Sequence, residues 1–479
     1  MIFKDWGNRM KRCVIFGAGF YGRGAFYKLK KHYEIAYYVD NNSAAHGNLL
    51  HGIEIISVDR LKEVLEKERM DIFICAQSYF AMANQLLEMG IKEYFVMLEG
   101  FLYHFDENEV MMPVEWESND YYKKQTNEKS ILFVQNTACI RTHKIAALMK
   151  KRGYKVFLLY TVAPPKSNNA SFEAIYEQIY TVFTANALIE FVNRSDFDII
   201  HSSNEPDSLT NYLLLTNKKI VFDTHDMMSL CGYDRMDTWS LEYLANTRSA
   251  GVIYTSEGVA QIAKKKFDLE EQKIFVLKNL ILEQIQIETR YEKLSRKDGQ
   301  IHCVYEGGIE GNDKNSLRYF EDLWRNIATC GIHIHFYSQS NYDYCVELDK
   351  KNEYFHFEGN IGSEELASEM TKYDCGLAIM NVNDGNRVLL ETASPNKINE
   401  YINSGLPVLV GDVQSAIDFV ERYGVGIHLD MEQDIISQFR KVQKIQIEDD
   451  FLKKNNLTMD SYGDELDKFY TRIIEGECE

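Results

Sequence analysis

Residues 394–412, SPNKINEYINSGLPVLVGD, place a lysine in the first turn of a predicted helix, where a cation is least favourable. Ser394 suits the N-cap and Pro395 the first helical position, so Lys397 becomes the third helical residue, beside backbone N–H groups that carry partial positive charge. Glu400 follows three residues later on the same helical face. The pattern indicates an anionic ligand at this helix start, and the alternative is a solvated surface contact between lysine and glutamate.

A second motif combines glycines with basic residues. The predicted strand at 301–305 ends in Gly307-Gly308, and Lys314 and Arg318 follow on the loop or the first helical turn beyond it. Backbone N–H groups of such a turn hold a diphosphate, and a nearby basic side chain neutralises the charge of a leaving phosphate. The sequence does not decide between Lys314 and Arg318 for that role.

Polar side chains also follow several buried strands in the middle of the chain. The segments FDIIHSSNE, KIVFDTHDMMSL and AGVIYTSEG each read as an apolar strand with polar residues at its carboxyl end. Because ligands of open α/β sheets bind at those ends, the pattern directs five residues toward one cleft. They are His201, Glu205, His225, Asp226 and Ser256.

Near the start of the chain, CVIFGAGFYGRGAFYKLKKHYEIAYYVDNN reads as a strand, a glycine-rich turn, a helix and a second strand. The turn has the spacing Gly17-x-Gly19-x-x-Gly22, and Asp40 lies at the end of the second strand, where an acid accepts a ribose hydroxyl. A nucleotide site is predicted here. The alternative is a glycine turn retained for packing, with an empty site.

Composition limits the class of protein. The chain has 479 residues, 45% of them hydrophobic, and a net charge of −19, which argues against a nucleic-acid-binding surface. The nine cysteines show no C-x-x-C pair, so neither a disulfide framework nor a zinc site is predicted, and a reducing cytosol is expected. No run of 18 apolar residues occurs, so the chain is expected to be cytoplasmic, at most peripheral to a membrane.

Strands and helices alternate throughout, which predicts an α/β protein with three Rossmann-like domains. The pattern restarts near residue 130 and again near 300. The expected division is a nucleotide-binding module at 1–105, a linker at 106–129, a domain at 130–295, a domain at 296–445, and helices at 446–479 that cross back.

From Ser130 onward the chain resembles GT-B glycosyltransferases, most closely those of family 4. The resemblance is carried by Gly307-Gly308, HFEGNIGSEELASEM, YDCGLAIM, FDTHD, VIYTSEG and above all SPNKINEYINSGLPVLV. It implies two domains with an interdomain cleft, and transfer of a sugar from a UDP- or GDP-linked donor to a glycan or lipid-linked acceptor. It also implies retention of the anomeric configuration, no metal, and a place in bacterial surface-polysaccharide or glycoconjugate assembly.

The resemblance also implies residue roles. Lys397 is expected to meet the donor phosphates, Glu400 the ribose hydroxyls, and His225 the transferred sugar or the acceptor, with help from Asp226. The catalytic set is thus His225, Asp226 and Lys397. The implied donor site consists of Ser256, Gly307, Gly308, Lys314, Arg318, Ser394, Asn396, Lys397 and Glu400.

The sequence departs from the family pattern at one carboxylate. The pattern has a second glutamate where this chain has Thr392, and the adjacent Glu391 is displaced by one residue. The first hundred residues are similar to Rossmann modules attached to bacterial polysaccharide enzymes, which implies binding of NAD or a sugar-nucleotide. Two alternatives stay open: an NAD-dependent oxidoreductase or epimerase acting through that module, and a non-catalytic protein that binds nucleotide-sugars or glycans.

Overall fold

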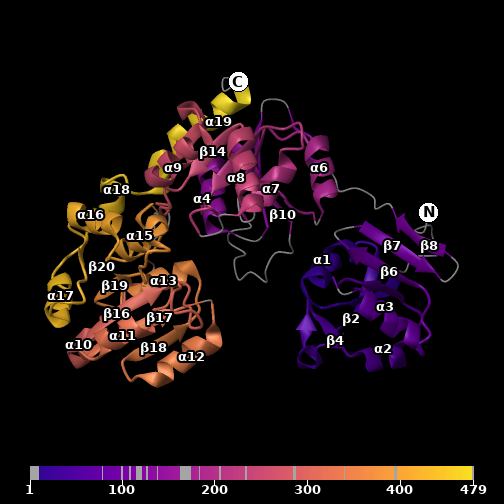
Figure 1. Cartoon of the computed structure of the whole chain (residues 1–479), viewed down its shortest axis with the longest axis horizontal. Coiled ribbons are helices and arrows are strands. Elements are labelled where there is room, and N and C mark those ends of the chain that lie inside the picture. The colour runs from indigo at the N-terminus through magenta and orange to yellow at the C-terminus, as the bar shows by residue number, and fades with distance from the viewer. Residues whose placement is uncertain are drawn as a thin grey trace.

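The structure is a computed structural model, and it contains three β-sheets with helices between their strands (Figure 1). It describes residues 10–77, 79–98, 101–106, 109–114, 121–125, 128–136, 139–161, 174–182, 184–203, 207–231, 235–283, 287, 289–338, 340–392 and 396–476. Within these ranges, the side chains of residues 98, 101, 106, 109–114, 363, 364 and 396 are not described.

The first sheet has eight strands in the order β3-β4-β2-β1-β5-β6-β7-β8. They are β1 (Lys11–Phe16), β2 (Tyr33–Val39), β3 (Leu49–Leu50), β4 (Ile53–Ile56), β5 (Asp71–Ile74), β6 (Tyr94–Leu98), β7 (Phe101–Asp106) and β8 (Glu109–Val114), with helices α1 (Phe20–Leu29), α2 (Val58–Leu65) and α3 (Tyr79–Glu88).

The centre of this sheet is parallel, and its end is an antiparallel extension. Strand β1 pairs in parallel with β2 and β5, whereas β7 pairs antiparallel with β6 and with β8. Strand β8 lies within the segment that the sequence predicts to be a linker. It is an edge strand, where a proline such as Pro113 is tolerated because it interrupts no central ladder.

The second sheet has seven strands, all parallel, in the order β11-β10-β9-β12-β13-β14-β15. They are β9 (Lys129–Gln135), β10 (Tyr154–Tyr160), β11 (Ile179–Thr181), β12 (Ile199–Ser203), β13 (Ile220–Thr224), β14 (Gly251–Tyr254) and β15 (Ile274–Val276), with helices α4 (Ile140–Lys150), α6 (Ala185–Arg194), α7 (Asp207–Leu213), α8 (Met236–Arg248) and α9 (Glu257–Phe267).

The third sheet has six parallel strands in the order β18-β17-β16-β19-β20-β21. They are β16 (Ile301–Glu306), β17 (Ile332–Tyr337), β18 (Phe355–Gly359), β19 (Cys375–Ala378), β20 (Val408–Val410) and β21 (Gly426–His428), with helices α10 (Ser295–Asp298), α11 (Glu321–Ala328), α12 (Tyr342–Lys351), α13 (Ser363–Met370), α14 (Arg387–Thr392), α15 (Asn396–Asn403), α16 (Gln414–Tyr423) and α17 (Ile435–Val442).

Several strands of the second sheet, such as β9 and β10, are almost continuous apolar runs, as expected for a parallel sheet covered on both faces. Ile131, Leu132, Phe133 and Val134 of β9 are fully buried, and the last strand residues of β12 and β13 are buried polar groups. This arrangement places polar side chains at the carboxyl edge of the sheet, where they are shielded from water but close to the loops.

The chain ends with α18 (Phe451–Lys454), η3 (Met459–Tyr462) and α19 (Gly463–Glu475). Helix α19 packs on the second sheet although it follows the third in sequence, as Figure 1 shows by its yellow colour beside β14. A Cβ atom built on Gly251 of β14 would lie 2.6 Å from Ile473 and Phe469 of α19. The missing side chain at Gly251 therefore allows the helix to approach the strand.

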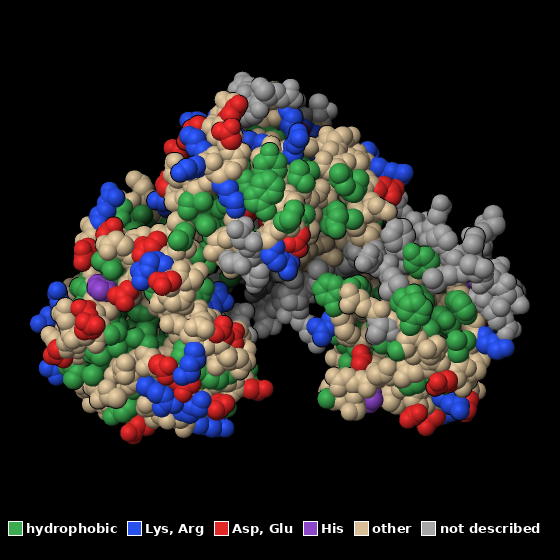
Figure 2. Space-filling view, in the orientation of Figure 1, with side chains coloured by type: hydrophobic (Ala, Val, Ile, Leu, Met, Phe, Trp, Pro, Cys, Tyr) green, Lys and Arg blue, Asp and Glu red, His purple; other side chains and the backbone are tan. Residues whose placement is uncertain are grey.

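The parts of the chain built on the first, second and third sheets are called here the first, second and third bodies. The second body has an exposed apolar patch. Figure 2 shows hydrophobic side chains gathered over α7 and α8, where Tyr212, Leu215, Met236, Trp239, Tyr243 and Leu244 are exposed. Among the described residues, no helix has the length and apolar character required to cross a bilayer.

Candidate functional site

Lys397 lies buried in the first turn of α15, as the sequence pattern requires. Its side chain is 9% exposed, and Nζ lies 4.1 Å from the centroid of the Tyr305 ring. Among the described residues no carboxylate oxygen comes within 4.0 Å of this ammonium group. A buried ammonium that has an aromatic face but no ion pair favours an anionic ligand, because burial of an isolated charge is costly.

The glycine turn after β16 lies directly beside that lysine. Gly307 has φ +125°, which favours glycine, and a Cβ atom built on it would lie 3.3 Å from Lys397 Nζ. A Cβ atom on Gly308 would lie 2.6 Å from the guanidinium of Arg318. The structure thus brings Gly307, Gly308, Arg318 and Lys397 together.

Lys314 does not join this group. Its side chain is exposed, its Nζ lies 3.5 Å from a carboxylate oxygen of Asp322, and it also lies over the ring of Tyr319. Of the two basic residues considered from the sequence, only Arg318 contacts the glycine turn. Lys314 points toward Asp322 and Tyr319 instead.

Glu306, the last residue of β16, is a site residue that the sequence analysis missed. It shares a hydrogen bond with Glu400 of α15, and its backbone N–H donates to the hydroxyl of Tyr401 at 3.0 Å. Burial and the neighbouring Glu400 carboxylate raise the pKa of Glu306 to about 8. At neutral pH the protonated form of Glu306 is therefore favoured, and its carboxyl group can donate the hydrogen bond that it shares with Glu400. The sequence feature that could have indicated Glu306 is its position at the end of a strand, directly before Gly307-Gly308.

Lys144 is a second missed residue, and it comes from α4 of the second body. It is 7% exposed, and no carboxylate oxygen of the described residues lies within 4.0 Å of Nζ. Burial lowers the pKa of Lys144, and the largest effect that opposes burial is the charge of Glu400. The charges of Lys144 and Lys397 both lower the pKa of Glu306, although burial and Glu400 raise it by more. Two buried ammonium groups from different bodies therefore converge on one pair of carboxyl groups.

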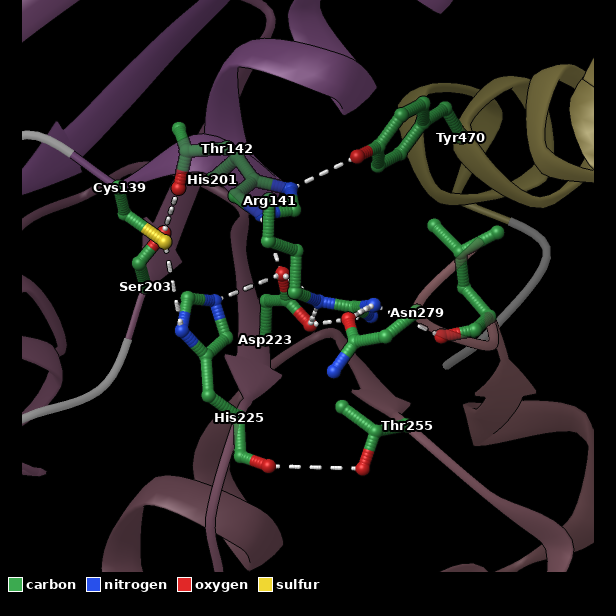
Figure 3. A network of polar contacts seen from close by, with 11 residues as sticks. Cys139, Arg141, Thr142, His201, Ser203, Asp223, His225, Thr255, Asn279 and Tyr470 are labelled. Atoms are coloured by element: carbon green, nitrogen blue, oxygen red, sulfur yellow. Dashed lines mark hydrogen bonds and ion pairs between the residues drawn. The ribbon is translucent and has the colours of Figure 1, made fainter. Parts of the chain in front are cut away.

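Next to this group, a network of buried polar residues surrounds Asp223, at the end of β13 (Figure 3). The carboxylate accepts hydrogen bonds from Arg141 Nε and Nη2 at 2.9–3.1 Å, and its Oδ2 lies 3.3 Å from His225 Nε2. Burial opposes ionisation, but the Arg141 guanidinium and His225 outweigh it and hold the pKa of Asp223 well below its ordinary value.

The carboxylate that contacts His225 is thus Asp223, whereas the sequence analysis assigned the assisting role to Asp226. Residues two apart in extended backbone point to the same side, so Asp223 and His225 face each other. Asp226 is exposed on the turn. Burial would lower the pKa of His225, but Asp223 and Cys139 outweigh burial and raise it to about 10. His225 is therefore an imidazolium at neutral pH.

Cys139 completes the network on the other side of His225, and the sequence analysis missed it too. It precedes α4, and its Sγ lies 3.6 Å from His225 Nδ1. Burial raises the pKa of a thiol, but the hydrogen bond to His225 and the N–H groups of Thr142 and Arg141 lower that of Cys139 overall. The arrangement is a thiol whose pKa is lowered by a neighbouring imidazolium, which is in turn held by a carboxylate.

His201 is directed away from the predicted cleft. Its Nδ1 lies 2.7 Å from the hydroxyl of Tyr470 on α19, and its Nε2 lies 3.4 Å from Asp223. Burial lowers the pKa of His201. This histidine therefore contacts Asp223 and ties the final helix to the sheet.

Ser256 also has a different role from the predicted one. Its hydroxyl accepts from Val259 N–H at the start of α9 and donates to the carbonyl of Thr392 on α14, so it joins the second and third bodies. Ser394 and Glu205 lie outside the described residues, and Asn396 begins α15 with a side chain that is not described.

Thr392 stands where the family pattern has a second glutamate, and both it and the adjacent Glu391 have partners within the protein. Thr392 hydrogen-bonds to carbonyls of its own helix. The adjacent Glu391 accepts the backbone N–H groups of Gln414 and Ser415 at 3.0 and 3.1 Å, so it caps α16. Neither residue presents a carboxylate to a sugar.

In the first body, the glycine turn lies beside Asp40. Gly17 has φ +112°, and its N–H donates to Val39 at 2.7 Å, while a Cβ atom on Gly22 would lie 1.7 Å from the Gly17 carbonyl oxygen. A Cβ atom on Gly19 would meet nothing within 4 Å. Asp40 Oδ2 accepts the N–H of Ala18 at 2.8 Å. Gly17 and Gly22 thus serve packing, and only Gly19 faces open space.

Three family sequence models match separate parts of the chain. Residues 140–281 match Glycosyltransferase Family 4, residues 321–456 match the C-terminal domain of Glucosyltransferase 3-like proteins, and residues 9–97 match a C2185-like N-terminal domain. A search of curated proteins gave no match.

Solved structures show the same fold at low sequence identity. Sucrose-phosphate synthase from Thermosynechococcus elongatus aligns with a TM-score of 0.52 at 11% identity, over 73% of this chain and 100% of that one. HepE from Anabaena, in complex with UDP and glucose, aligns with a TM-score of 0.50 at 14% identity, over 72% and 98%. The solved structures confirm the α/β GT-B fold. The family models add that the second sheet region is similar to Glycosyltransferase Family 4 and the third to the C-terminal domain of Glucosyltransferase 3-like proteins.

Proposed function

We propose that the chain transfers a sugar from a nucleotide-sugar to an acceptor, and that the donor diphosphate lies where Lys144 and Lys397 converge. The observation that carries the proposal is that these two buried ammonium groups lack ion pairs among the described residues. The raised pKa of Glu306 favours its neutral form, so the two lysines face a carboxyl pair that does not carry its full negative charge. The local charge is positive within a chain of net charge −19, which suits a diphosphate.

The proposed chemistry stabilises the leaving group. The bond between the anomeric carbon and the diphosphate oxygen breaks as the acceptor oxygen bonds to that carbon, and the acceptor proton leaves with the phosphate or through solvent. Lys397, Lys144, Arg318 and the amides of Gly307 and Gly308 are positioned to hold the charge that develops on the phosphate. Glu400 is proposed to accept the ribose hydroxyls, and the His225 imidazolium to contact the transferred sugar.

Ligand stabilisation tests this assignment. Thermal unfolding is followed with UDP, GDP, CMP and UDP-sugars for the wild type, Glu400→Gln and the control Glu421→Gln, an exposed residue of α16. A ligand at 100 times its dissociation constant stabilises by about 2.7 kcal/mol. We expect one nucleoside diphosphate to stabilise the wild type and the control but not Glu400→Gln. Failure of every nucleotide to stabilise the wild type contradicts the proposal.

Transfer itself separates an enzyme from a binding protein. Release of the nucleoside diphosphate from the stabilising donor is measured with glycan and lipid-linked acceptors, and the product anomer is read by NMR. We propose retention and activity in the presence of EDTA. A donor that binds but is never consumed favours the non-catalytic alternative. A lipid-linked acceptor, a place in polysaccharide assembly, a cytoplasmic location and peripheral membrane contact stay predictions from the sequence.

We also propose that the three sheets mark three domains close to the predicted ones, since the family matches at 9–97, 140–281 and 321–456 each cover strands of a single sheet. The match at 321–456 extends past the predicted boundary at 445, and β8 extends the first sheet into the predicted linker. The first domain is proposed to bind a nucleotide-containing ligand, NAD or a sugar-nucleotide, over Gly19. The open space at Gly19 beside the start of α1 supports that proposal. Tyr27 and Lys31 have the spacing of a dehydrogenase pair but follow the turn too closely, so a binding role is favoured over hydride transfer.

A further inference from the structure

Four of the twelve histidines of the chain lie on three neighbouring strands of the third sheet. They are His302 on β16, His333 and His335 on β17, and His356 on β18, and they are called here the histidine cluster. In the strand register His302 is opposite His333, and His335 is opposite His356. The rings of His302 and His333 stack with centroids 4.6 Å apart. The proposed donor site uses none of these side chains.

The cluster forms a chain of polar contacts with a carboxylate at each end. Asp298 Oδ2 lies 3.0 Å from His302 Nε2, His302 Nδ1 lies 2.9 Å from His335 Nε2, and His335 Nδ1 lies 2.7 Å from a carboxylate oxygen of Glu358. Three hydrogen bonds require three hydrogens. Two neutral imidazoles supply one each, and the carboxylates supply none. One of the three contacts therefore lacks a hydrogen, and a bound cation at that contact would replace it.

The exposed end of this series of contacts, at Asp298, has side chains that can bind such a cation. Ligand atoms of Asp298, His302 and His333 all lie within 4.8 Å of one another. Asp298 is exposed, whereas His302 is buried, so the group opens to solvent on one side. The Gln300 side-chain oxygen is 2.8 Å from His333 Nε2 and is available as a further oxygen ligand. Two imidazoles and a carboxylate are a donor set that suits zinc, with bonds of about 2.0–2.2 Å.

We propose that Asp298, His302 and His333 bind a divalent transition metal, with zinc as the best match to the ligands. A metal on the Nε2 atoms leaves Nδ1–H of His302 to donate to His335, whose own Nδ1–H then donates to Glu358. His333 Nδ1–H donates to His356, where the nitrogens are 2.7 Å apart. Every hydrogen bond then has its hydrogen, and each metal ligand has the outer partner that fixes its tautomer.

The site is structural rather than catalytic. Asp298 ends α10 and His302 lies near the amino end of β16, whereas Glu306 and the glycine turn lie at the carboxyl end of the same strand. The metal would join the α10–β16 connection to β17. This inference is independent of the proposed transferase activity. It departs from the sequence analysis, which predicts no zinc site because the cysteines form no C-x-x-C pair, since the ligands proposed here are histidines and an aspartate.

Zinc binding to the tag-free full-length chain tests the inference. The protein is stripped with EDTA and exchanged into buffer at pH 7.5, and zinc is added in equilibrium dialysis and in calorimetry. We expect one equivalent to bind and the melting temperature to rise. Asp298→Asn and His333→Gln should each weaken binding at least about tenfold. The control is His428→Gln, which removes a partly exposed histidine paired with Asp412 in the same sheet.

Far-UV circular dichroism of each variant shows whether it folds, and magnesium, which prefers oxygen ligands, should not compete. Cobalt substituted for zinc reports the nitrogen and oxygen ligands through its visible spectrum. The inference is overturned if the wild type binds no zinc, or if His428→Gln weakens binding as much as His333→Gln. It is also overturned if acid stabilises the cluster while zinc does not bind, because the missing cation is then a proton.

Discussion

Lys144 on α4 interacts electrostatically with Glu400 on α15, and this interaction is the largest that opposes the lowering of the Lys144 pKa by burial. The two residues are 256 positions apart in the sequence. A ligand that contacts both therefore requires the second and third bodies together, and neither body alone is expected to bind a nucleotide tightly.

Lys144→Met tests this relationship, because methionine retains the length of the side chain and removes its charge. A hydrogen bond to a charged group contributes about 1.5–3 kcal/mol. We expect the affinity for the stabilising nucleoside diphosphate to fall about 10- to 100-fold in calorimetry, with the fold unchanged. Lys150→Met, on the exposed end of the same helix, is the matched control. Equal affinity in the two variants would remove Lys144 from the donor site.

Glu306→Gln should change the pH dependence of stability. The pKa of Glu306 is about 8 in the folded chain against an ordinary 4.5, so the folded state holds a proton that the unfolded state releases between these values. Wild-type stability from this group is therefore full at low pH and is lost as pH rises toward 8. Glutamine mimics the protonated form and removes that loss.

The free energies of unfolding of the two proteins are compared from pH 5 to pH 8.5 by chemical denaturation. We expect Glu306→Gln to gain relative to the wild type by up to about 1.4 kcal/mol for each pH unit. In Glu400→Gln the pKa of Glu306 should fall, because a neighbouring charge is gone, and the slope should flatten. Parallel curves for all three proteins would show that Glu306 is ionised in the folded chain.

Cys139 should react with iodoacetamide as a thiolate near neutral pH. His225 beside it is an imidazolium with a pKa of about 10, so the thiolate form persists below the ordinary pKa of cysteine. We expect its alkylation rate, followed by peptide mass spectrometry, to level off at a lower pH than that of the partly exposed Cys330. His225→Gln should restore a steep pH dependence at Cys139.

A second measurement asks whether the bound nucleotide-sugar protects Cys139 from alkylation. If Cys139 lies beside the transferred sugar, the nucleotide-sugar that stabilises the protein should slow alkylation of Cys139 and leave Cys330 unaffected. A rate at Cys139 that rises with pH in parallel with Cys330 would mean that its thiol is neutral and that the network in Figure 3 serves packing alone.

The local features of the donor site could be predicted from the sequence, because a cap, a proline and a glycine turn act within a few residues. Lys397, Gly307 and Gly308 are examples, and the structure places them side by side. Residues that meet through tertiary packing could not be found this way. Lys144 and Cys139 lie in a helix and a loop with no motif, and only the fold brings them to Glu400 and His225.

Two predicted positions have surroundings that differ from the expectation for physical reasons. The carboxylate found beside His225 is Asp223, because side chains two apart in extended backbone share a side. Ser256 was placed with the donor because it ends a strand, although the first residue before a helix uses its hydroxyl to cap that helix, as Ser256 does at α9. Both rules were available from the sequence alone.

The last prediction concerns the glycine turn of the first body, where two glycines of one motif should behave differently. A Cβ atom on Gly22 would lie 1.7 Å from the carbonyl oxygen of Gly17, which is backbone and cannot move aside cheaply. We therefore expect Gly22→Ala to destabilise this body by more than about 1–3 kcal/mol, the range for overpacking. Gly19→Ala meets nothing within 4 Å, at a φ of −76° that alanine adopts.

Gly19→Ala should thus unfold at the wild-type temperature in the absence of ligand, and any difference that appears with NAD or a sugar-nucleotide reports ligand binding alone. Loss of ligand stabilisation in this variant locates the ligand over Gly19, because the new methyl group occupies the space that a phosphate needs beside the start of α1. Equal stabilisation of wild type and Gly19→Ala would place the ligand elsewhere and leave the turn a packing feature, as Gly17 and Gly22 already are.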